Sequence, residues 1–137
     1  MTFAVARYTA DEWMEYSDSA HRLVFKESRN PELDRISFAL LAHNQKSPVG
    51  YVTCREIDAD SLYWQYGGAM DEFKGFNAVR AFKLFFDYCK ERYKRITTLV
   101  KNDNVQYLHL LMKMGFRAIG LRCFANEIYL EMFWGEQ

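Results

Sequence analysis

The chain has 137 residues, half of them hydrophobic, and its 18 basic side chains balance 18 acidic ones. That length is typical of one domain, and a composition so hydrophobic and without net charge excludes an intrinsically disordered chain. A net charge of zero also argues against a dedicated nucleic-acid-binding protein, because such proteins carry an excess of basic residues.

The three cysteines, Cys54, Cys89 and Cys123, are odd in number and far apart in the sequence. This spacing fits neither a disulfide framework nor a Cys-x-x-Cys metal pair, and His21 and His43 have no metal-ligand pattern around them. The N-terminus lacks the features of a signal peptide, and no apolar run reaches the length of a membrane span. We therefore expect a single cytoplasmic domain over residues 1–137, with no metal site and no membrane partner.

The N-terminal half of the chain predicts a strand, a helix and a three-stranded meander. Residues 2–8 are rich in strand-forming residue types. Thr9 and Glu12 have the spacing of a capping box, which would begin an amphipathic helix that runs to about residue 26. Alternating apolar residues between turn segments then predict three antiparallel strands. These strands are expected at residues 35–43, 49–57 and 61–66.

The C-terminal half predicts two helices and three strands. An apolar stripe at helical spacing predicts a helix over residues 75–94, and a short apolar run at 96–100 predicts a buried strand. A second helix is predicted over residues 104–114, where Gly115 has the position of a C-terminal glycine cap. The last two strands are expected at residues 116–124 and 127–133. The predicted order is therefore β-α-βββ-α-β-α-β-β.

The strand–helix–strand unit directs attention to one edge of the predicted sheet. Its crossover makes strands 61–70 and 96–100 parallel neighbours, and ligands in such sheets bind beyond the carboxyl ends of the parallel strands. Lys74 and Gly75 lie beyond the first of these ends, where a helix begins. A helix N-terminus suits a phosphate group, because its N–H groups and its dipole favour negative charge.

A second stretch beyond these strand ends carries a family resemblance. It reads Val100-Lys-Asn-Asp-Asn104, and the helix after it ends in Lys113-Met-Gly115-Phe116. Together with the element order, this pattern resembles the C-terminal half of the GNAT superfamily, the acetyl-CoA-dependent N-acyltransferases. The resemblance implies an α/β fold (α+β in some schemes), in which a mixed, mostly antiparallel sheet has helices on both faces.

In that family two parallel strands are splayed apart, and the pantetheine arm of acetyl-CoA lies in the gap. The resemblance therefore implies that acetyl-CoA is the co-substrate, and that its arm pairs with the end of strand 61–70. The family's pyrophosphate loop, Arg/Gln-x-x-Gly-x-Gly/Ala, corresponds here to the segment that begins at Lys74. The residues implied in cofactor binding are Ala69, Met70, Lys74, Gly75, Asn77, Ala78 and Asn104.

The chain departs from the family pattern at the loop and at the catalytic positions. Asn77 and Val79 stand where glycines are usual, and the branched side chain of Val79 would crowd the phosphates. Leu111 stands where the family often has a proton-donating tyrosine, and residues 61–66 contain no carboxylate to serve as a general base. The candidate catalytic residues are Tyr66 and His109, with Tyr107 as a further substitute on the same helix.

Two hypotheses about function stay open. The first is acetyl transfer from acetyl-CoA to a primary amine of a small molecule or peptide. The second is a catalytically inactive GNAT-like binding or assembly protein, which the departures favour. Residues 64–68, Trp-Gln-Tyr-Gly-Gly, are similar to a segment of small acetyltransferase-like proteins of tailed phages. An open gap between strands 61–70 and 96–100 would favour the enzyme, and a closed gap the binding protein.

Further expectations concern the acceptor and the surfaces. Arg29, Arg35 and Arg122 are candidates for contacting an acidic acceptor. The last strand ends in apolar residues that meet either the domain's own core or a second copy, and exposed sheet edges favour a homodimer. Most aromatic residues are assigned to packing. Those that flank the predicted cofactor loop, and are expected to line a cleft, are Tyr63, Trp64, Tyr66, Phe73 and Phe76.

Overall fold

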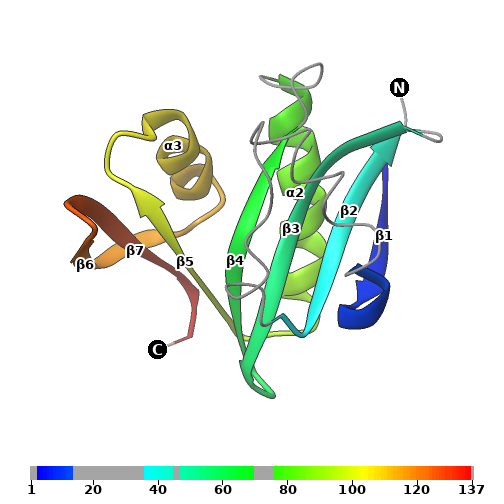
Figure 1. The fold of residues 1–137 in the computed structure, drawn as a ribbon, viewed down its shortest axis with the longest axis horizontal. Coiled ribbons are helices and arrows are strands. Elements are labelled where there is room, and N and C mark those ends of the chain that lie inside the picture. The colour runs from blue at the N-terminus through cyan, green and yellow to red at the C-terminus, as the bar shows by residue number, and fades with distance from the viewer. Residues whose placement is uncertain (1–2, 14–35, 45–46, 70–75, 137) are drawn as a thin grey trace.

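The computed structural model describes residues 3–13, 36–44, 47–69 and 76–136 (Figure 1). The strands in these ranges are β1 (Phe3–Thr9), β2 (Phe38–Asn44), β3 (Ser47–Asp58), β4 (Ser61–Ala69), β5 (Arg95–Lys101), β6 (Arg117–Phe124) and β7 (Glu127–Gly135). The helices are α2 (Phe76–Lys90) and α3 (Val105–Lys113), and residues 10–13 are also helical. The predicted continuation of that first helix to residue 26 lies outside the described residues.

The strands form one mixed sheet in the order β1-β2-β3-β4-β5-β7-β6. Strands β4 and β5 pair in parallel, whereas the other neighbouring strands pair antiparallel. This confirms the predicted fold class and the predicted parallel pair. The pairing of β4 with β5 also joins the N-terminal meander to the C-terminal part of the sheet.

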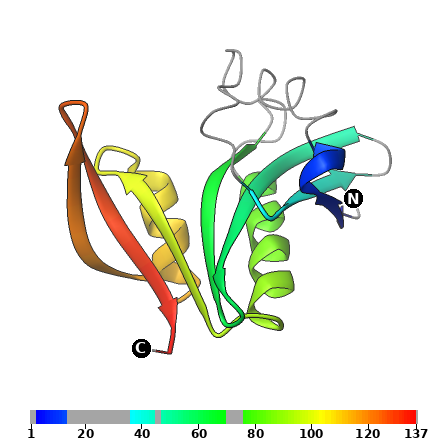
Figure 2. The same ribbon diagram turned by 60° about the horizontal axis from the view of Figure 1, so that its bottom comes forward.

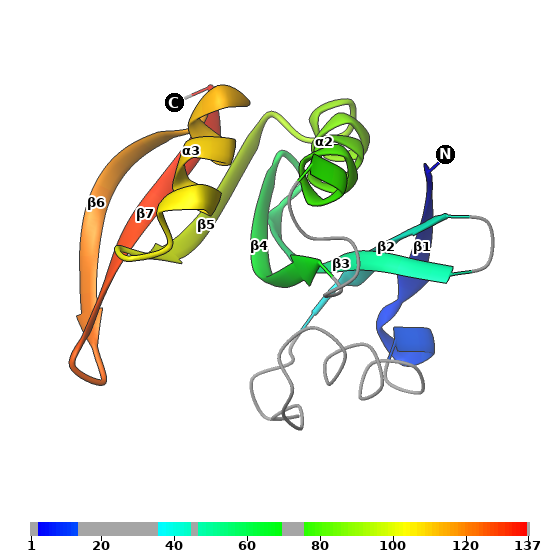
Figure 3. The same cartoon turned by 90° about the horizontal axis from the view of Figure 1, so that it is seen from above.

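The main core lies between the sheet and helices α2 and α3, which cover the same face (Figure 3). Helix α2 forms here because its apolar residues recur at helical spacing and are buried together against the sheet. Those residues are Ala81, Phe82, Phe85, Phe86 and Cys89. Burying each large side chain contributes roughly 1.5–3 kcal/mol, so this stripe holds the helix in place.

The other face of the sheet carries a smaller core around Trp13. The predicted capping box is confirmed: the Glu12 N–H donates to Thr9 Oγ1 at 3.2 Å, and the Thr9 N–H donates to Glu12 Oε1 at 3.0 Å. These bonds begin the helical turn that presents Trp13 to Tyr51, with their ring centroids 5.1 Å apart. Helical residues therefore cover both faces, as predicted.

Helix α2 ends four residues before the predicted end at residue 94. The N–H groups of Lys94 and Arg95 both donate to the Asp60 carbonyl, at 2.8 and 3.0 Å, and this turns the chain back into β5. Tyr93 extends the apolar stripe in the sequence, but it packs from this turn, with its ring 6.3 Å from that of Phe38. A tertiary contact thus ends the helix before its periodicity does.

The end of β7 packs on the domain's own core, which is one of the two predicted alternatives. The ring of Trp134 meets that of Phe86 of α2 edge to face, with the centroids 5.0 Å apart. Such aromatic pairs contribute roughly 0.5–1.5 kcal/mol beyond the area they bury.

Candidate active site

Strands β4 and β5 pair along four residues and then separate. Residues 61–64 of β4 lie beside residues 95–98 of β5. Strand β4 continues to Ala69 paired with β3, with a register shift between Trp64 and Tyr66, whereas β5 continues to Lys101 in register with β7. The sheet therefore divides into two arms, one of β1 to β4 and one of β5, β7 and β6, that diverge from a shared base (Figure 2).

A side-chain hydrogen bond marks the point of separation. The buried hydroxyl of Thr98 donates to the Trp64 carbonyl at 3.0 Å, at the last pair in register. Beyond it, the edge of β4 from Gln65 to Ala69 that faces β5 has no strand beside it in the described sheet. Backbone groups on such an edge can pair with an extended ligand as they would with a strand.

Aromatic rings join the two arms on the side of α2 and α3. Phe116, from the Lys-x-Gly-Phe pattern, lies between Trp64 and Phe86, with centroid distances of 5.6 and 5.8 Å. The preceding Gly115 has a φ of +99°, a conformation that glycine adopts without steric cost. The pattern therefore turns the chain out of α3 and packs a ring where the arms meet.

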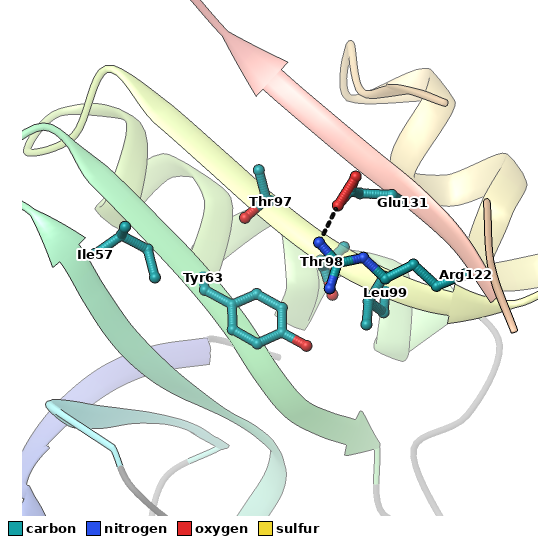
Figure 4. Close-up of a pocket in the computed structure, with 7 residues that line it drawn as sticks. All are labelled: Ile57, Tyr63, Thr97, Thr98, Leu99, Arg122 and Glu131. Atoms are coloured by element: carbon teal, nitrogen blue, oxygen red, sulfur yellow. Dashed lines mark hydrogen bonds and ion pairs between the residues drawn. The ribbon is translucent and has the colours of Figure 1, made fainter. Parts of the chain in front are cut away.

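A pocket of about 230 Å³ lies on the opposite face of the sheet, beside the point of separation (Figure 4). The residues that line it are Ile57, Tyr63, Thr97, Thr98, Leu99, Arg122 and Glu131. Tyr63 and Glu131 alternate along their strands with core residues, so their side chains face away from α2 and α3. Tyr63 was expected to line a cleft beside the predicted cofactor loop, and it lines this pocket, which contains no residue of that loop. The same expectation for Trp64 is wrong, because Trp64 faces the helices and is 1% exposed.

The pocket presents two opposite charges and a neutral hydroxyl. Arg122 Nη2 lies 3.0 Å from Glu131 Oε1. The other carboxylate oxygen, Oε2, lies 3.5 Å from where a methyl group on Gly120 would be. Burial raises the pKa of Tyr63, so its phenol keeps its proton at neutral pH and can donate a hydrogen bond.

Part of the predicted cofactor site lies at the diverging ends of β4 and β5. Ala69 is the last residue of β4, and Asn77 and Ala78 lie in the first turn of α2. Asn104 caps α3 shortly after β5, and its Oδ1 accepts a hydrogen bond from the Tyr107 N–H at 3.4 Å. The predicted residues that lie outside the described ranges are Met70, Lys74 and Gly75.

Of the predicted catalytic candidates, His109 lies away from the pocket. It is exposed on α3, which covers the other face, and it does not line the pocket. Tyr66 belongs to β4, but its side chain lies outside the described part of the structure. Leu111 is fully buried in the main core, and Tyr107 packs on Phe82 with the ring centroids 5.3 Å apart.

Glu131 is a carboxylate of the pocket that the sequence did not predict, because a general base was expected from the strand before the cofactor loop. That strand was expected at residues 61–66, whereas the structure brings a carboxylate to the pocket from β7, which pairs with β5. The only signal in the sequence is a charged residue between the apolar residues Leu130 and Met132. Arg122, one of three arginines considered for an acidic acceptor, does line the pocket.

Neither a metal centre nor a membrane helix is found in the described part of the chain. No three or more His, Cys, Asp or Glu side chains of these residues gather where they could hold a metal ion. No helix among them is both long enough and apolar enough to span a membrane.

Many solved acetyltransferase structures share this fold. The ribosomal-protein-S18-alanine N-acetyltransferase from Escherichia coli matches with a TM-score of 0.79 at 7% identity, over 98% of this chain and 94% of that one. A GNAT family acetyltransferase from Elizabethkingia anophelis with acetyl-CoA bound matches with a TM-score of 0.76 at 15% identity, over 98% of each chain. Arabidopsis thaliana Naa50, in complex with the bisubstrate analogue CoA-Ac-MVNAL, matches with a TM-score of 0.76 at 13% identity, over 99% of this chain and 100% of that one.

Sequence comparison adds no closer relative: no protein-family model matches this chain, and no curated protein does. At these low identities the structural matches establish the fold. The chain has the fold of the GNAT acetyltransferases over nearly its whole length, as the sequence resemblance implied.

Proposed function

We propose that this protein transfers an acetyl group from acetyl-CoA to a primary amine. The observation that carries the proposal is the separation of β4 from β5 after residue 64. An open separation favours an enzyme, because it leaves a strand edge inside the sheet against which the cofactor can bind. A protein that had lost the cofactor would have no ligand for that edge. The proposal is also supported by solved structures of the same fold that contain acetyl-CoA or a CoA bisubstrate analogue.

The cofactor would pair with the open edge of β4. Gly67 and Gly68 carry no side chain there, which allows close approach of a ligand to the backbone. Helices α2 and α3 both begin near the diverging strand ends, and their N-terminal dipoles favour the negative charge of the pyrophosphate. The residues proposed to hold acetyl-CoA are Ala69, Met70, Lys74, Gly75, Asn77, Ala78 and Asn104.

The acceptor amine would enter from the pocket on the opposite face. Glu131 would hold its ammonium group by charge, and the hydroxyl oxygen of Tyr63 would accept a hydrogen bond from it. Acetyl-CoA would supply the activated acetyl group. Once the amine has lost one proton to ordered water, its nitrogen would bond to the thioester carbonyl carbon, the C–S bond would break, and the second proton lost from that nitrogen would pass to the departing CoA thiolate. Holding both reactants in line supplies much of the rate of such a transfer. Tyr66 and His109 stay candidates for the proton transfers.

One observation favours the second candidate function, a catalytically inactive binding or assembly protein of phage type. Leu111 is fully buried in the core, so α3 offers no proton donor at the position where the family often has a tyrosine. An inactive protein would have the same fold as the enzyme but would show no turnover.

Turnover with a panel of primary amines distinguishes the two functions. The protein is incubated with acetyl-CoA and each amine, and the release of free CoA and the acetylated product are measured. We expect Glu131→Gln to lower kcat/KM by about tenfold, because a charge-assisted hydrogen bond is lost. Glu127→Gln is the matched control, since Glu127 pairs with Lys101 outside the pocket. Binding of acetyl-CoA without product from any amine would favour the inactive protein.

A further inference from the structure

The pocket opposite α2 and α3 holds a cation and an anion side by side. The side chains of Arg122 and Glu131 are 61% and 26% exposed, so both are accessible to a ligand. Their contact joins one guanidinium nitrogen to one carboxylate oxygen. A guanidinium has five N–H donors, so Arg122 keeps donors for a second anion, and Glu131 keeps Oε2 as an acceptor. Figure 4 shows the two side chains meeting above β5.

The rest of the lining sets the size and polarity of the ligand. Ile57 and Leu99 are apolar, and the ring of Tyr63 lies between them in the pocket lining. The volume of about 230 Å³ falls below the roughly 300–1,000 Å³ of pockets that take drug-sized ligands. The pocket therefore suits one small molecule with a single apolar substituent.

The paired charges restrict which small molecule fits. A simple monoamine would pair with Glu131 but would compete with Arg122 for it, and Arg122 would gain nothing in return. A simple carboxylate would bind Arg122 and repel Glu131. A ligand with both charges a few bonds apart compensates each side chain, because its ammonium meets the carboxylate and its carboxylate meets the guanidinium.

We infer that the acceptor is a zwitterion the size of one amino acid, held through its ammonium by Glu131 and through its carboxylate by Arg122. The inference rests on the proposed function, because it names the class of amine that receives the acetyl group. It favours a free amino acid over the N-terminus of a peptide, whose first carboxyl group is a neutral amide.

The test compares three ligands that share one apolar group. L-leucine carries both charges, L-leucinamide lacks the carboxylate, and 4-methylpentanoate lacks the ammonium. Each is titrated calorimetrically into the full-length protein, with and without saturating CoA, and acetyl-CoA is titrated into the same protein separately. We expect L-leucine to bind at least about tenfold more tightly than either of the others, because each lacks one charge-assisted pair.

Two variants locate the binding. Arg122→Gln is expected to weaken L-leucine by about tenfold, because the carboxylate contact is lost. It should leave L-leucinamide bound at least as tightly, because Arg122 no longer competes with the ammonium for Glu131. Arg117→Gln is the control, since Arg117 is exposed on the same strand and does not line the pocket. The ion pair between Arg122 and Glu131 is exposed and therefore adds little to stability. The Arg122 variant is expected to fold for this reason.

The outcomes separate this inference from the proposed function. L-leucinamide that binds as tightly as L-leucine would overturn the inference in favour of a peptide N-terminus. Equal loss in the Arg117 and Arg122 variants would also overturn it. If acetyl-CoA binds but none of the three ligands does, the inference fails and the proposed function stands. If L-leucine binds as expected but acetyl-CoA does not, the pocket assignment stands and the proposed function fails.

Discussion

Gly115 shows how a single residue supports the packing of the whole domain. Its φ of +99° lies in a region that side chains rarely adopt, and the next residue, Phe116, packs between the two arms of the sheet. We expect Gly115→Ala to lower the free energy of unfolding by about 1–2 kcal/mol, measured by urea denaturation, because alanine is strained there. The added methyl group itself would lie 3.5 Å from Trp134, an ordinary van der Waals distance, so it would cause no clash.

Gly120→Ala is the matched control for Gly115→Ala. The methyl group would again meet its nearest atom at 3.5 Å, but Gly120 has no positive φ. The stability change at Gly120 should therefore stay within about 0.5 kcal/mol, as for most surface substitutions. Equal losses in both variants would show that space, not backbone conformation, determines the cost.

Tyr93 predicts a dependence of stability on alkaline pH. Its hydroxyl donates to Glu56 Oε1 at 2.5 Å, and burial, followed by this carboxylate, raises its pKa well above the ordinary value of 10.0. The folded protein therefore keeps a proton that the unfolded chain loses, so the stabilisation is complete below about pH 10 and declines as the pH rises above it. Tyr93→Phe should show a shallower decline in urea denaturation between pH 9 and pH 11 (a range of about two units around that pKa). An unchanged slope would contradict this.

Single residues of the candidate site were predictable only where their neighbours in the sequence indicate their position. Asn104 was predicted to begin a helix because it follows a short apolar strand and precedes an apolar segment, and it does cap α3. Its place beside the cofactor was implied by the family resemblance and stays a prediction. Glu131 was not found, because its place beside Arg122 depends on which strands are neighbours and on their register. No local pattern in the sequence contains that information.

Helix α3 offers an experiment that separates capping from cofactor binding. The side chain of Asn104 caps the helix through Oδ1, and the proposed function also places it beside acetyl-CoA. Asn104→Asp keeps a capping acceptor, so stability should change by less than about 0.5 kcal/mol, whereas Asn104→Ala should lose about 1 kcal/mol. The aspartate should also weaken acetyl-CoA, because it places a negative charge near the phosphates.

Thermal unfolding and calorimetric titration together check both roles of Asn104. A destabilised Asn104→Ala variant that binds acetyl-CoA normally would limit this residue to capping. Weaker binding in the stable Asn104→Asp variant would support its place in the cofactor site.

The helices and strands were predictable to the extent that local signals determine them. The capping box at Thr9 and Glu12 and the glycine that ends α3 are formed as expected, because both depend on residues close in the sequence. The end of α2 was placed too late. Its last turn gives way to bonds with the Asp60 carbonyl, which comes from the turn between β3 and β4.

The order of elements and the single parallel pair were predicted from local signals, and together with the family resemblance they gave the correct fold class. The divergence of β4 and β5 was expected only through the family resemblance, since neither strand carries a sequence signal for where pairing stops. In the structure, the stopping point coincides with the bond from Thr98 to the Trp64 carbonyl and with the aromatic rings beneath it. The two arms of the sheet therefore stay packed together at the point where β4 and β5 separate, and the sheet remains continuous although the edge of β4 is open.

Hydrogen–deuterium exchange with and without acetyl-CoA shows whether the open edge of β4 binds the cofactor. If the cofactor pairs with the open edge of β4, the amides of residues 65–69 should exchange more slowly when it is bound, because ligand hydrogen bonds protect them. Residues 117–124 of edge strand β6 should exchange unchanged and serve as the internal control. Saturating acetyl-CoA that leaves residues 65–69 unprotected, or protects only another part of the chain, would contradict the account.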